Sequence, residues 1–250
     1  MSVPAPLPKG VLLRVFVRSL FIQAAWNPQG MQNLGFAWAM GPALRVLYPD
    51  PKLRAQAAAR HLEFFNCHPY LAASILGAAV HVEAQVATGE EPPEKVSQLK
   101  RALGPPFAAL GDGFYWLALR PAAALVAALT VPTLGLWSLA VFLGLYNTLH
   151  LGGRVWLFSE GLRRGSGVIA TLAQVKVPHA TGLLKASAAV MAGALAARAV
   201  LEAALPARPG HALLVAGLTV AGVALVPKVR FAVALYTALL LGLVIGGSFL

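Results

Sequence analysis

Carboxylate side chains are scarce in this sequence, and three of them lie in or beside apolar segments. Only nine of the 250 residues are Asp or Glu, and the three in apolar surroundings are Glu63, Glu83 and Asp112. An ionisable group at membrane depth is costly, so its presence points to a function or to an ion pair within the fold. An ion pair is the simpler interpretation for each residue alone. Three such acids beside Pro and Gly breaks favour a functional role for the set.

The densest polar cluster is the string RHLEFFN, which lies in an amphipathic helix that we predict over residues 51–68. Glu63 and Asn66 are three residues apart and would share a helix face, whereas His61 and Glu63 are two apart and would not. That spacing argues against a zinc site of the HExxH type, in which both ligands need one face. His68, two turns after His61, leaves a two-histidine site geometrically possible, but we predict no metal.

A second polar stripe lies in the apolar segment 70–88. Ser74, His81 and Gln85 are seven and four residues apart and would lie along one helix face, while Glu83 would point elsewhere. The stripe could face a partner or a sugar path, or it could supply hydrogen bonds between packed helices. The sequence leaves both interpretations open.

Asp112 stands between two glycines at the end of a segment rich in Gly and Pro, residues 102–113. Non-helical backbone at membrane depth is tolerated only inside protein or against a cavity, and broken segments often build transporter substrate sites. We therefore predict a broken or re-entrant segment here. Asp112 could accept hydrogen bonds from sugar hydroxyls or cap a helix starting near Phe114. Tyr115 and Trp116 could stack on a pyranose ring or anchor the helix at the membrane interface.

A third set of residues recurs at seven-residue spacing: Asn147, Arg154 and Gly161. Such residues drift slowly around one face of a helix. The guanidinium of Arg154 could extend to the cytoplasm, or it could pair with an acid inside the membrane.

Motifs for covalent chemistry are missing from the sequence. It contains neither a phosphate-binding GxxxxGKS or GxxxxGKT loop nor a GxSxG nucleophile elbow. The single cysteine, Cys67, excludes an intrachain disulfide and a multi-thiolate metal site. We therefore predict no catalytic residue, no cofactor and no metal, and we expect that the chain is not an enzyme by itself.

The composition requires an apolar exterior. Hydrophobic residues make up 58% of the chain and charged residues 12%, with a mean hydropathy of +0.70, whereas soluble domains carry about 25% charged residues. The net charge is +11, but the basic residues form small clusters between apolar runs, as they do at the cytoplasmic flanks of membrane segments. We therefore predict a multi-pass protein of the lipid bilayer and no binding of nucleic acid.

The chain divides into three regions. Residues 1–10 are predicted to be a disordered N-terminus, residues 11–116 a motif-bearing helical region with partly membrane-embedded helices, and residues 117–250 a transmembrane region. The fold class that follows is all-α: a polytopic helical membrane protein with an N-terminal interfacial, amphipathic helix. That first helix is expected over residues 11–26.

Apolar runs of about 20 residues mark the transmembrane helices. Residues 117–152 are long enough for two passes, with the turn near Pro132 and Gly135, and three further spans are predicted at 186–205, 211–226 and 231–250. Basic residues in 153–185 indicate a cytoplasmic connection. The C-terminus would then lie outside.

The sequence resembles the IID component of the mannose/fructose/sorbose family of phosphoenolpyruvate-dependent sugar phosphotransferase systems (PTS). Four stretches within residues 14–165 carry the resemblance. Their matching residues are Arg18, Ser19, Gln23, Trp26, Asn27, Met31, Gln32, Leu34, Gly35, Phe36, Pro42, Leu47, Tyr48 and Pro49; the string RHLEFFN with Pro69, Ile75, Leu76 and Gly77; Pro106, Gly111, Asp112, Trp116, Arg120 and Pro121; and Asn147, Arg154, Gly161 and Gly165.

The resemblance implies a permease subunit of the bacterial cytoplasmic (inner) membrane. In this family IID pairs with a IIC subunit in a trimer of heterodimers, and the complex carries a hexose that a cytoplasmic IIAB protein phosphorylates. The phosphohistidines belong to those partners. The candidate residues for a substrate path or a IIC interface are His61, Glu63, Asn66, His81, Glu83, Gln85, Asp112, Trp116, Asn147 and Arg154.

Two departures from the family pattern suggest an alternative function. The family's two adjacent glutamates before a glutamine are here Glu83 and Ala84, and two glycines of the family's G-P-L-A-G-x-G-D string are replaced by Pro105 and Ala109. Glycine permits close approach of the backbone. The alternative is a divergent, non-transporting IID-like scaffold or sensor.

Overall fold

The computed structural model describes residues 7–204, and this part of the chain is built from helices and turns without a strand. The helices are α1 (Lys9–Ser19), α2 (Asn33–Leu47), α3 (Pro51–His61), α4 (Ala72–Ala87), α5 (Glu94–Gly111), the π-helix η1 (Asp112–Leu119), α6 (Arg120–Leu134), α7 (Trp137–Arg164), the 3-10 helix η2 (Gly165–Gly167), α8 (Val168–Gln174) and α9 (Val177–Ala204). The chain forms two compact units, Met1–Ala189 and Val190–Leu250. The description below concerns the first unit.

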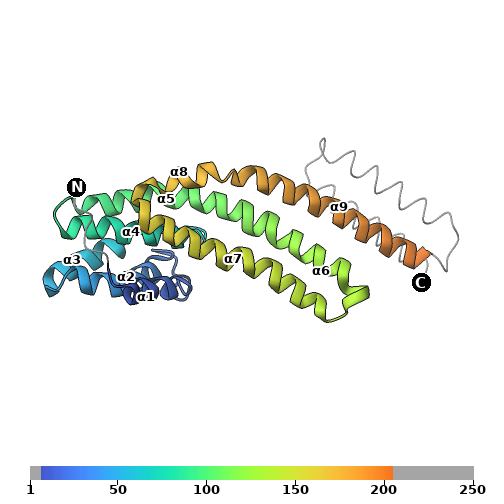
Figure 1. The fold of residues 1–250 in the computed structure, drawn as a ribbon, viewed down its shortest axis with the longest axis horizontal. Helices are drawn as coiled ribbons and strands as arrows, with labels where there is room; N and C mark the ends of the chain where they lie inside the picture. The colour runs from blue at the N-terminus through green and yellow to red at the C-terminus, as the bar shows by residue number, and fades with distance from the viewer. Residues whose placement is uncertain (1–6, 205–250) are drawn as a thin grey trace. The chain divides into compact units, whose positions relative to one another are not determined.

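Helix α4 is the centre of the first unit. Most of its side chains are buried, including Ile75 and Leu76, and it packs most extensively against α7 and also against α2 and α5. With 16 residues it is about 24 Å long, shorter than the roughly 30 Å of a bilayer core. Figure 1 shows α1 to α4 gathered at one end of this unit, with α6 and α7 side by side.

Two glycines allow α4 and α7 to touch along their backbones. A Cβ on Gly77 would overlap the Phe158 carbonyl, and a Cβ on Gly161 would overlap the Ser74 carbonyl. Small residues at such a crossing let two helices approach closely, a common device of membrane proteins. The seven-residue set of α7 therefore includes one residue, Gly161, that serves helix packing.

The helix predicted over residues 51–68 is shorter in the structure. It starts as expected, with Asp50 accepting a hydrogen bond of 2.8 Å from the amide of Lys52 and a proline at the first position. It ends at His61, because the following residues pair with an earlier loop: the amide of Gln32 donates to the carbonyl of Phe65 at 2.9 Å. The prediction that Glu63 and Asn66 share a helix face is therefore wrong.

Helix α1 also differs at its ends from the prediction. It begins at Lys9, so the last two residues of the expected disordered segment 1–10 are helical, and residues 1–6 lie outside the described range. It ends at Ser19, after which successive turns replace the expected helix to residue 26.

The segment rich in Gly and Pro is helical throughout. Residues Glu94–Leu134 form one continuous helical run of 41 residues, so the prediction of a re-entrant segment at 102–113 is wrong. The interruption takes another form, since the backbone widens from α to π geometry at Asp112–Leu119. Asp112 does not cap a helix start, because the helix is already continuous there.

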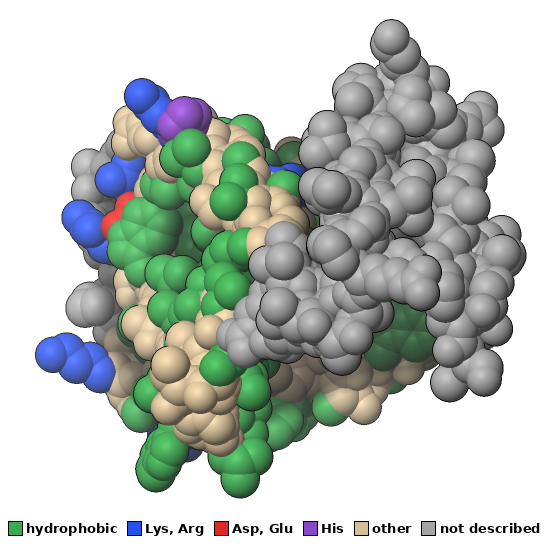
Figure 2. Space-filling model, turned by 90° about the vertical axis from the view of Figure 1, so that its right-hand side faces the viewer, with side chains coloured by type: hydrophobic (Ala, Val, Ile, Leu, Met, Phe, Trp, Pro, Cys, Tyr) green, Lys and Arg blue, Asp and Glu red, His purple; other side chains and the backbone are tan. Residues whose placement is uncertain are grey.

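Helices α6 and α7 form a hairpin whose turn agrees with the sequence prediction. Gly135 has a φ of +52°, a conformation that favours glycine. Next to it, Leu136 and Trp137 are 95% and 76% exposed. Figure 2, viewed from one end of the first unit, shows hydrophobic side chains over much of the described surface, with Lys and Arg at its edges.

One helical run among residues 7–204, Glu94–Leu134, has the length and hydropathy of a membrane span. The expected connection 153–185 is mostly helical, since α7 continues to Arg164 and α9 begins at Val177. The predicted spans 211–226 and 231–250, and with them the C-terminus, lie outside the described residues.

Candidate functional site

A buried ion cluster joins four helices around Glu83. We call it the carboxylate cluster; its members are Tyr48, Arg60, His61, Glu83 and Lys100. The side chains of His61 and Glu83 are fully buried, and Lys100 is 2% exposed. Tyr48 follows α2, and the other members come from α3, α4 and α5.

Both oxygens of Glu83 are occupied by donors. Arg60 donates to Oε1 from Nε and to Oε2 from Nη2, each at 2.7 Å, which is the bidentate geometry that makes arginine–carboxylate pairs strong. The hydroxyl of Tyr48 donates to Oε2 at 2.7 Å. The ammonium of Lys100 donates to the backbone carbonyl of Arg60 at 2.8 Å, so Lys100 contacts the residue that binds Glu83.

The pKa values in this cluster follow from burial and from the arginine. Burial is the largest single effect and would raise the pKa of Glu83, but the contributions of Arg60, His61 and Tyr48 together outweigh it and lower the pKa to about 2. Burial lowers the pKa of His61, which is therefore neutral at pH 7. Its Nε2 lies 2.8 Å from Oε1 of Glu83, outside hydrogen-bond geometry. The cluster is closed to solvent and suits holding helices together.

A second buried cluster lies where the loop before α4 meets η1 and α7. We call it the aromatic cluster; its members are His68, Tyr70, Tyr115, Trp116, Tyr146, His150 and Arg154. The ring of Tyr70 stacks on that of His150 with centroids 3.7 Å apart, and its hydroxyl lies 3.1 Å from the hydroxyl of Tyr146.

The π-helix η1 supplies two aromatic rings to this cluster. Tyr115 stacks on His68 with ring centroids 5.1 Å apart. The ring centroid of Trp116 lies 4.9 Å from that of the same imidazole. Gly111 makes room for His68, since a Cβ there would overlap the imidazole. π-helical turns inside α-helices are rare and occur frequently at functional sites.

Arg154 crosses the aromatic cluster and binds two backbone carbonyls. It is 4% exposed, and its Nη2 donates to the carbonyls of Ser19 at 3.2 Å and Pro69 at 2.8 Å. Its guanidinium lies 5.0 Å from the ring centre of Tyr70. Among the residues that the structure describes, no carboxylate lies within ion-pair distance of it.

Three buried nitrogen atoms in the aromatic cluster have no hydrogen-bond partner within the described part of the chain. They are Nε2 of His68, Nδ1 of His150 and Nε of Arg154. Burial lowers the pKa of His68 to about 4, and the charge of Arg154 acts in the same direction. Two further nitrogen atoms of this kind, Nδ1 and Nε2 of His61, lie in the carboxylate cluster, so buried nitrogens without a partner occur in both clusters of the described chain.

The ten candidate residues from the sequence separate into members of the two clusters and residues outside them. His61 and Glu83 belong to the carboxylate cluster, while Trp116 and Arg154 belong to the aromatic cluster. The structure does not bring the remaining six to either cluster. They are Glu63, Asn66, His81, Gln85, Asp112 and Asn147.

Two of these six residues, Glu63 and His81, make local contacts that account for a polar side chain at their positions. Glu63 is exposed and accepts a hydrogen bond from Ser97 at 2.9 Å. Nδ1 of His81 lies 2.8 Å from the carbonyl of Leu162, a contact between α4 and α7, so the polar stripe of α4 serves packing at this residue. Asp112 and Asn66 are exposed on the surface of the described chain.

Sequence reasoning missed Tyr70, Tyr146 and His150. The spacing of Tyr146, His150 and Arg154, each four residues from the next, is the signal that could have found two of them, since it places three side chains on one helix face. Tyr70 gave no such signal, because it stands alone in a turn.

The described residues form an all-helical fold in which one run, Glu94–Leu134, has the length and hydropathy of a membrane span. The profile of the PTS mannose/fructose/sorbose family IID component matches residues 6–212. The chain therefore belongs to this family of bacterial inner-membrane proteins.

Individual relatives agree with this assignment. The mannose-specific EIID component of Escherichia coli K12 is 38% identical over 157 residues, which cover 62% of this chain and 56% of that protein. The fructose permease IID component of Bacillus subtilis is 30% identical over 176 residues, covering 70% and 64%. The match thus spans little more than half the length of the first relative.

Solved structures show the same fold. The mannose transporter ManYZ, solved in complex with a microcin, contains a chain that matches with a TM-score of 0.61 and 28% identity over 97% of both chains. A second structure, described as a membrane protein, matches with a TM-score of 0.69 and 32% identity, covering 77% of this chain and 71% of that one.

Proposed function

We propose that this chain is the IID subunit of a mannose-family sugar permease. With a IIC subunit it carries a hexose across the inner membrane, and a IIAB partner phosphorylates the sugar on the cytoplasmic side. The chain performs no covalent step itself. The observation that carries the proposal is the similarity to a chain of the mannose transporter ManYZ over 97% of both chains.

The aromatic cluster supports a transport role. A cation without an anion in an apolar setting costs free energy, so its presence usually indicates a functional role. Arg154, three partnerless nitrogens and stacked rings meet at one place, beside the π-helix that carries Trp116 and Asp112. Aromatic rings and polar groups are what a sugar needs for recognition. We propose that this cluster positions η1 for the IIC subunit and the sugar path.

The departures from the family pattern are compatible with transport. The two lost glycines, at Pro105 and Ala109, lie at exposed positions of α5, so their side chains do not crowd the core of the described chain. The glycine that faces His68, Gly111, is retained. Of the family's two adjacent acids, Glu83 is retained and paired.

The proposed topology is multi-pass, with the C-terminus outside and the basic residues Arg163 and Arg164 at the cytoplasmic face. The proposed assembly is a trimer of IIC–IID pairs. The charge pattern supports the topology and the family supports the assembly; with this topology the end of α7 would face the side where IIAB acts.

Sugar uptake by a defined set of proteins tests the proposal. The chain is co-expressed with its IIC and IIAB partners in a strain that lacks other mannose-family permeases, and phosphoenolpyruvate-dependent uptake of labelled hexoses is measured. We expect uptake that requires all three proteins. A IIC–IID complex that assembles fully but moves no hexose would instead support the non-transporting scaffold.

A further inference from the structure

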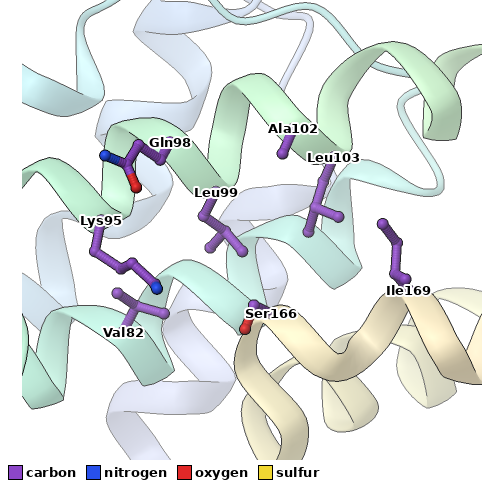
Figure 3. A pocket seen from close by; sticks show the side chains of 8 residues that line it. All are labelled: Val82, Lys95, Gln98, Leu99, Ala102, Leu103, Ser166 and Ile169. Atoms are coloured by element: carbon purple, nitrogen blue, oxygen red, sulfur yellow. The ribbon is translucent and has the colours of Figure 1, made fainter.

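A groove of about 270 Å³ opens where α4, the first half of α5 and the η2–α8 turn meet. Figure 3 shows its lining: Val82, Lys95, Gln98, Leu99, Ala102, Leu103, Ser166 and Ile169. It is separate from both buried clusters and shares no residue with them.

The groove combines an apolar floor with hydrogen-bond donors at its rim. Val82, Leu99 and Leu103 are buried and form the floor. Lys95 is half-buried, and Figure 3 shows its ammonium directed toward Val82. No carboxylate lines the groove. Within the described residues Lys95 forms no ion pair, so its charge is available.

The neighbouring end of α7 adds further positive charge. Arg163 and Arg164 both bind one carboxylate, Glu160, at 3.0 and 2.6 Å. Two cations on one anion leave a surplus positive charge beside Ser166. A cationic surface of this kind attracts an acidic partner and repels a basic one.

The shape of the groove fits an acidic side chain with its aliphatic stem. The methylene groups of a glutamate would cover Leu99 and Leu103, while its carboxylate would reach Lys95 and the hydroxyl of Ser166. A phosphate group is best held by several converging donors, whereas a single ammonium enters this groove. The chemistry therefore favours a protein carboxylate.

We propose that this groove receives an acidic, partly apolar segment of the cytoplasmic IIAB partner. The inference rests on the proposed function and on its orientation, in which the end of α7 faces the cytoplasm. It assigns the IID subunit a direct part in docking the phosphotransfer protein beside the sugar's exit.

Binding of IIAB to the IIC–IID complex in nanodiscs tests the inference. Lys95→Glu should weaken IIAB affinity about tenfold or more, because it places like charges face to face. Ser166→Trp, which fills the groove without changing charge, should weaken it as well. The control is Lys52→Glu, which reverses an exposed lysine on α3 and should bind like wild type. Thermal unfolding of each complex confirms that the variants fold.

Cross-linking gives an independent test. A zero-length carbodiimide joins a lysine amine to a carboxylate in contact with it, so Lys95 should be recovered by mass spectrometry joined to an Asp or Glu of IIAB. Lys95 joined only to its own chain would overturn the inference.

Three further outcomes are distinguishable. Wild-type uptake with unchanged IIAB binding by Lys95→Glu and Ser166→Trp would overturn the docking groove and leave the proposed function intact. If Lys95→Glu instead reduced retention of anionic lipid by the complex while IIAB bound normally, the groove would be a lipid site and the inference would fall. Loss of uptake by the wild-type set would overturn the proposed function itself.

Discussion

The carboxylate cluster and the aromatic cluster each contain an arginine, but they satisfy its charge in different ways. Arg60 binds both oxygens of Glu83, and every oxygen of that carboxylate has a donor. Arg154 binds backbone carbonyls and stacks near Tyr70, with no carboxylate in range among the described residues. Removing one partner of a buried ion pair is strongly destabilising, because it leaves an uncompensated charge, whereas a cation that has no anion in an apolar setting is costly and is a candidate for function.

The comparison separates the residues that hold this fold from those that we propose to serve transport. Glu83 was a candidate for the sugar path from the sequence, because an acid in an apolar helix suggests function. We propose a structural role for it instead, because it is fully buried and both of its oxygens have donors. Arg154 and Trp116 keep their candidacy, since the guanidinium in their cluster has no carboxylate partner among the described residues.

The largest expected effect is that of removing the charge of Glu83. Glu83→Gln leaves Arg60 and Lys100 buried without an anion, and the free energy of unfolding should fall by about 3–5 kcal/mol. Thermal unfolding of the purified complex in detergent measures it. The matched control is Glu63→Gln, which breaks the exposed ion pair of Glu63 with Arg101 at 3.5 Å and should cost less than about 1 kcal/mol. Equal losses for the two variants would contradict the structural role of Glu83.

The second largest loss of stability is expected from disturbing the contact between α4 and α7, the helices that carry Glu83 and Arg154. In Gly161→Ala the new methyl group overlaps the Ser74 carbonyl, and forcing the backbones apart should cost about 1–3 kcal/mol. Gly144→Ala on the same helix meets nothing within 4 Å and should be neutral or slightly stabilising. A stable Gly161→Ala variant would show that the helices do not touch there.

Arg154→Met should cost less stability than Glu83→Gln. It leaves the carbonyls of Ser19 and Pro69 without a donor, a loss of about 1–3 kcal/mol for a buried polar group, but it strands no opposite charge. Chemical unfolding of the two variants side by side gives the order. The reverse order would mean that Arg154 has a carboxylate partner in the intact protein.

The smallest expected effect is a loss of stability in mild acid, where the histidines are protonated at a higher pH than Glu83. His61 and His68 have pKa values below the ordinary 6.5, so unfolding lets them bind protons. Their contribution is complete above about pH 6.5 and is lost as the pH falls below that value, for His68 down to about pH 4. Glu83, with a pKa of about 2, stays charged over this range. The unfolding temperature should therefore fall from pH 7 to pH 4, and His68→Asn should flatten the slope. An unchanged slope would contradict burial of a neutral His68.

Local signals in the sequence predicted some of these elements correctly. The apolar run at 70–88 corresponds to α4, and Gly135 marks the hairpin turn as predicted. Both depend on short-range effects, namely a continuous apolar segment and a residue that tolerates positive φ.

Tertiary contacts decided what the sequence did not reveal. Leu62, Phe64 and Phe65 continue the apolar pattern of α3, and only pairing of Phe65 with the loop at Met31 shows why the helix ends. The π-helix was also missed for this reason. It coincides with the stacking of Tyr115 on His68, and the sequence gives no sign that these two residues meet. Glu83 was recognised as unusual, but its partner Arg60 lies 23 residues away and no helical spacing connects them.

Hexose uptake per assembled complex compares the two clusters most directly. The amount of IIC–IID complex in the membrane and its phosphoenolpyruvate-dependent uptake are measured together for wild type, Arg154→Met and Glu83→Gln. Glu83→Gln should reduce the amount of complex but not the uptake of each complex that forms, whereas Arg154→Met should assemble and lose uptake. Normal uptake per complex by Arg154→Met would contradict a transport role for the aromatic cluster.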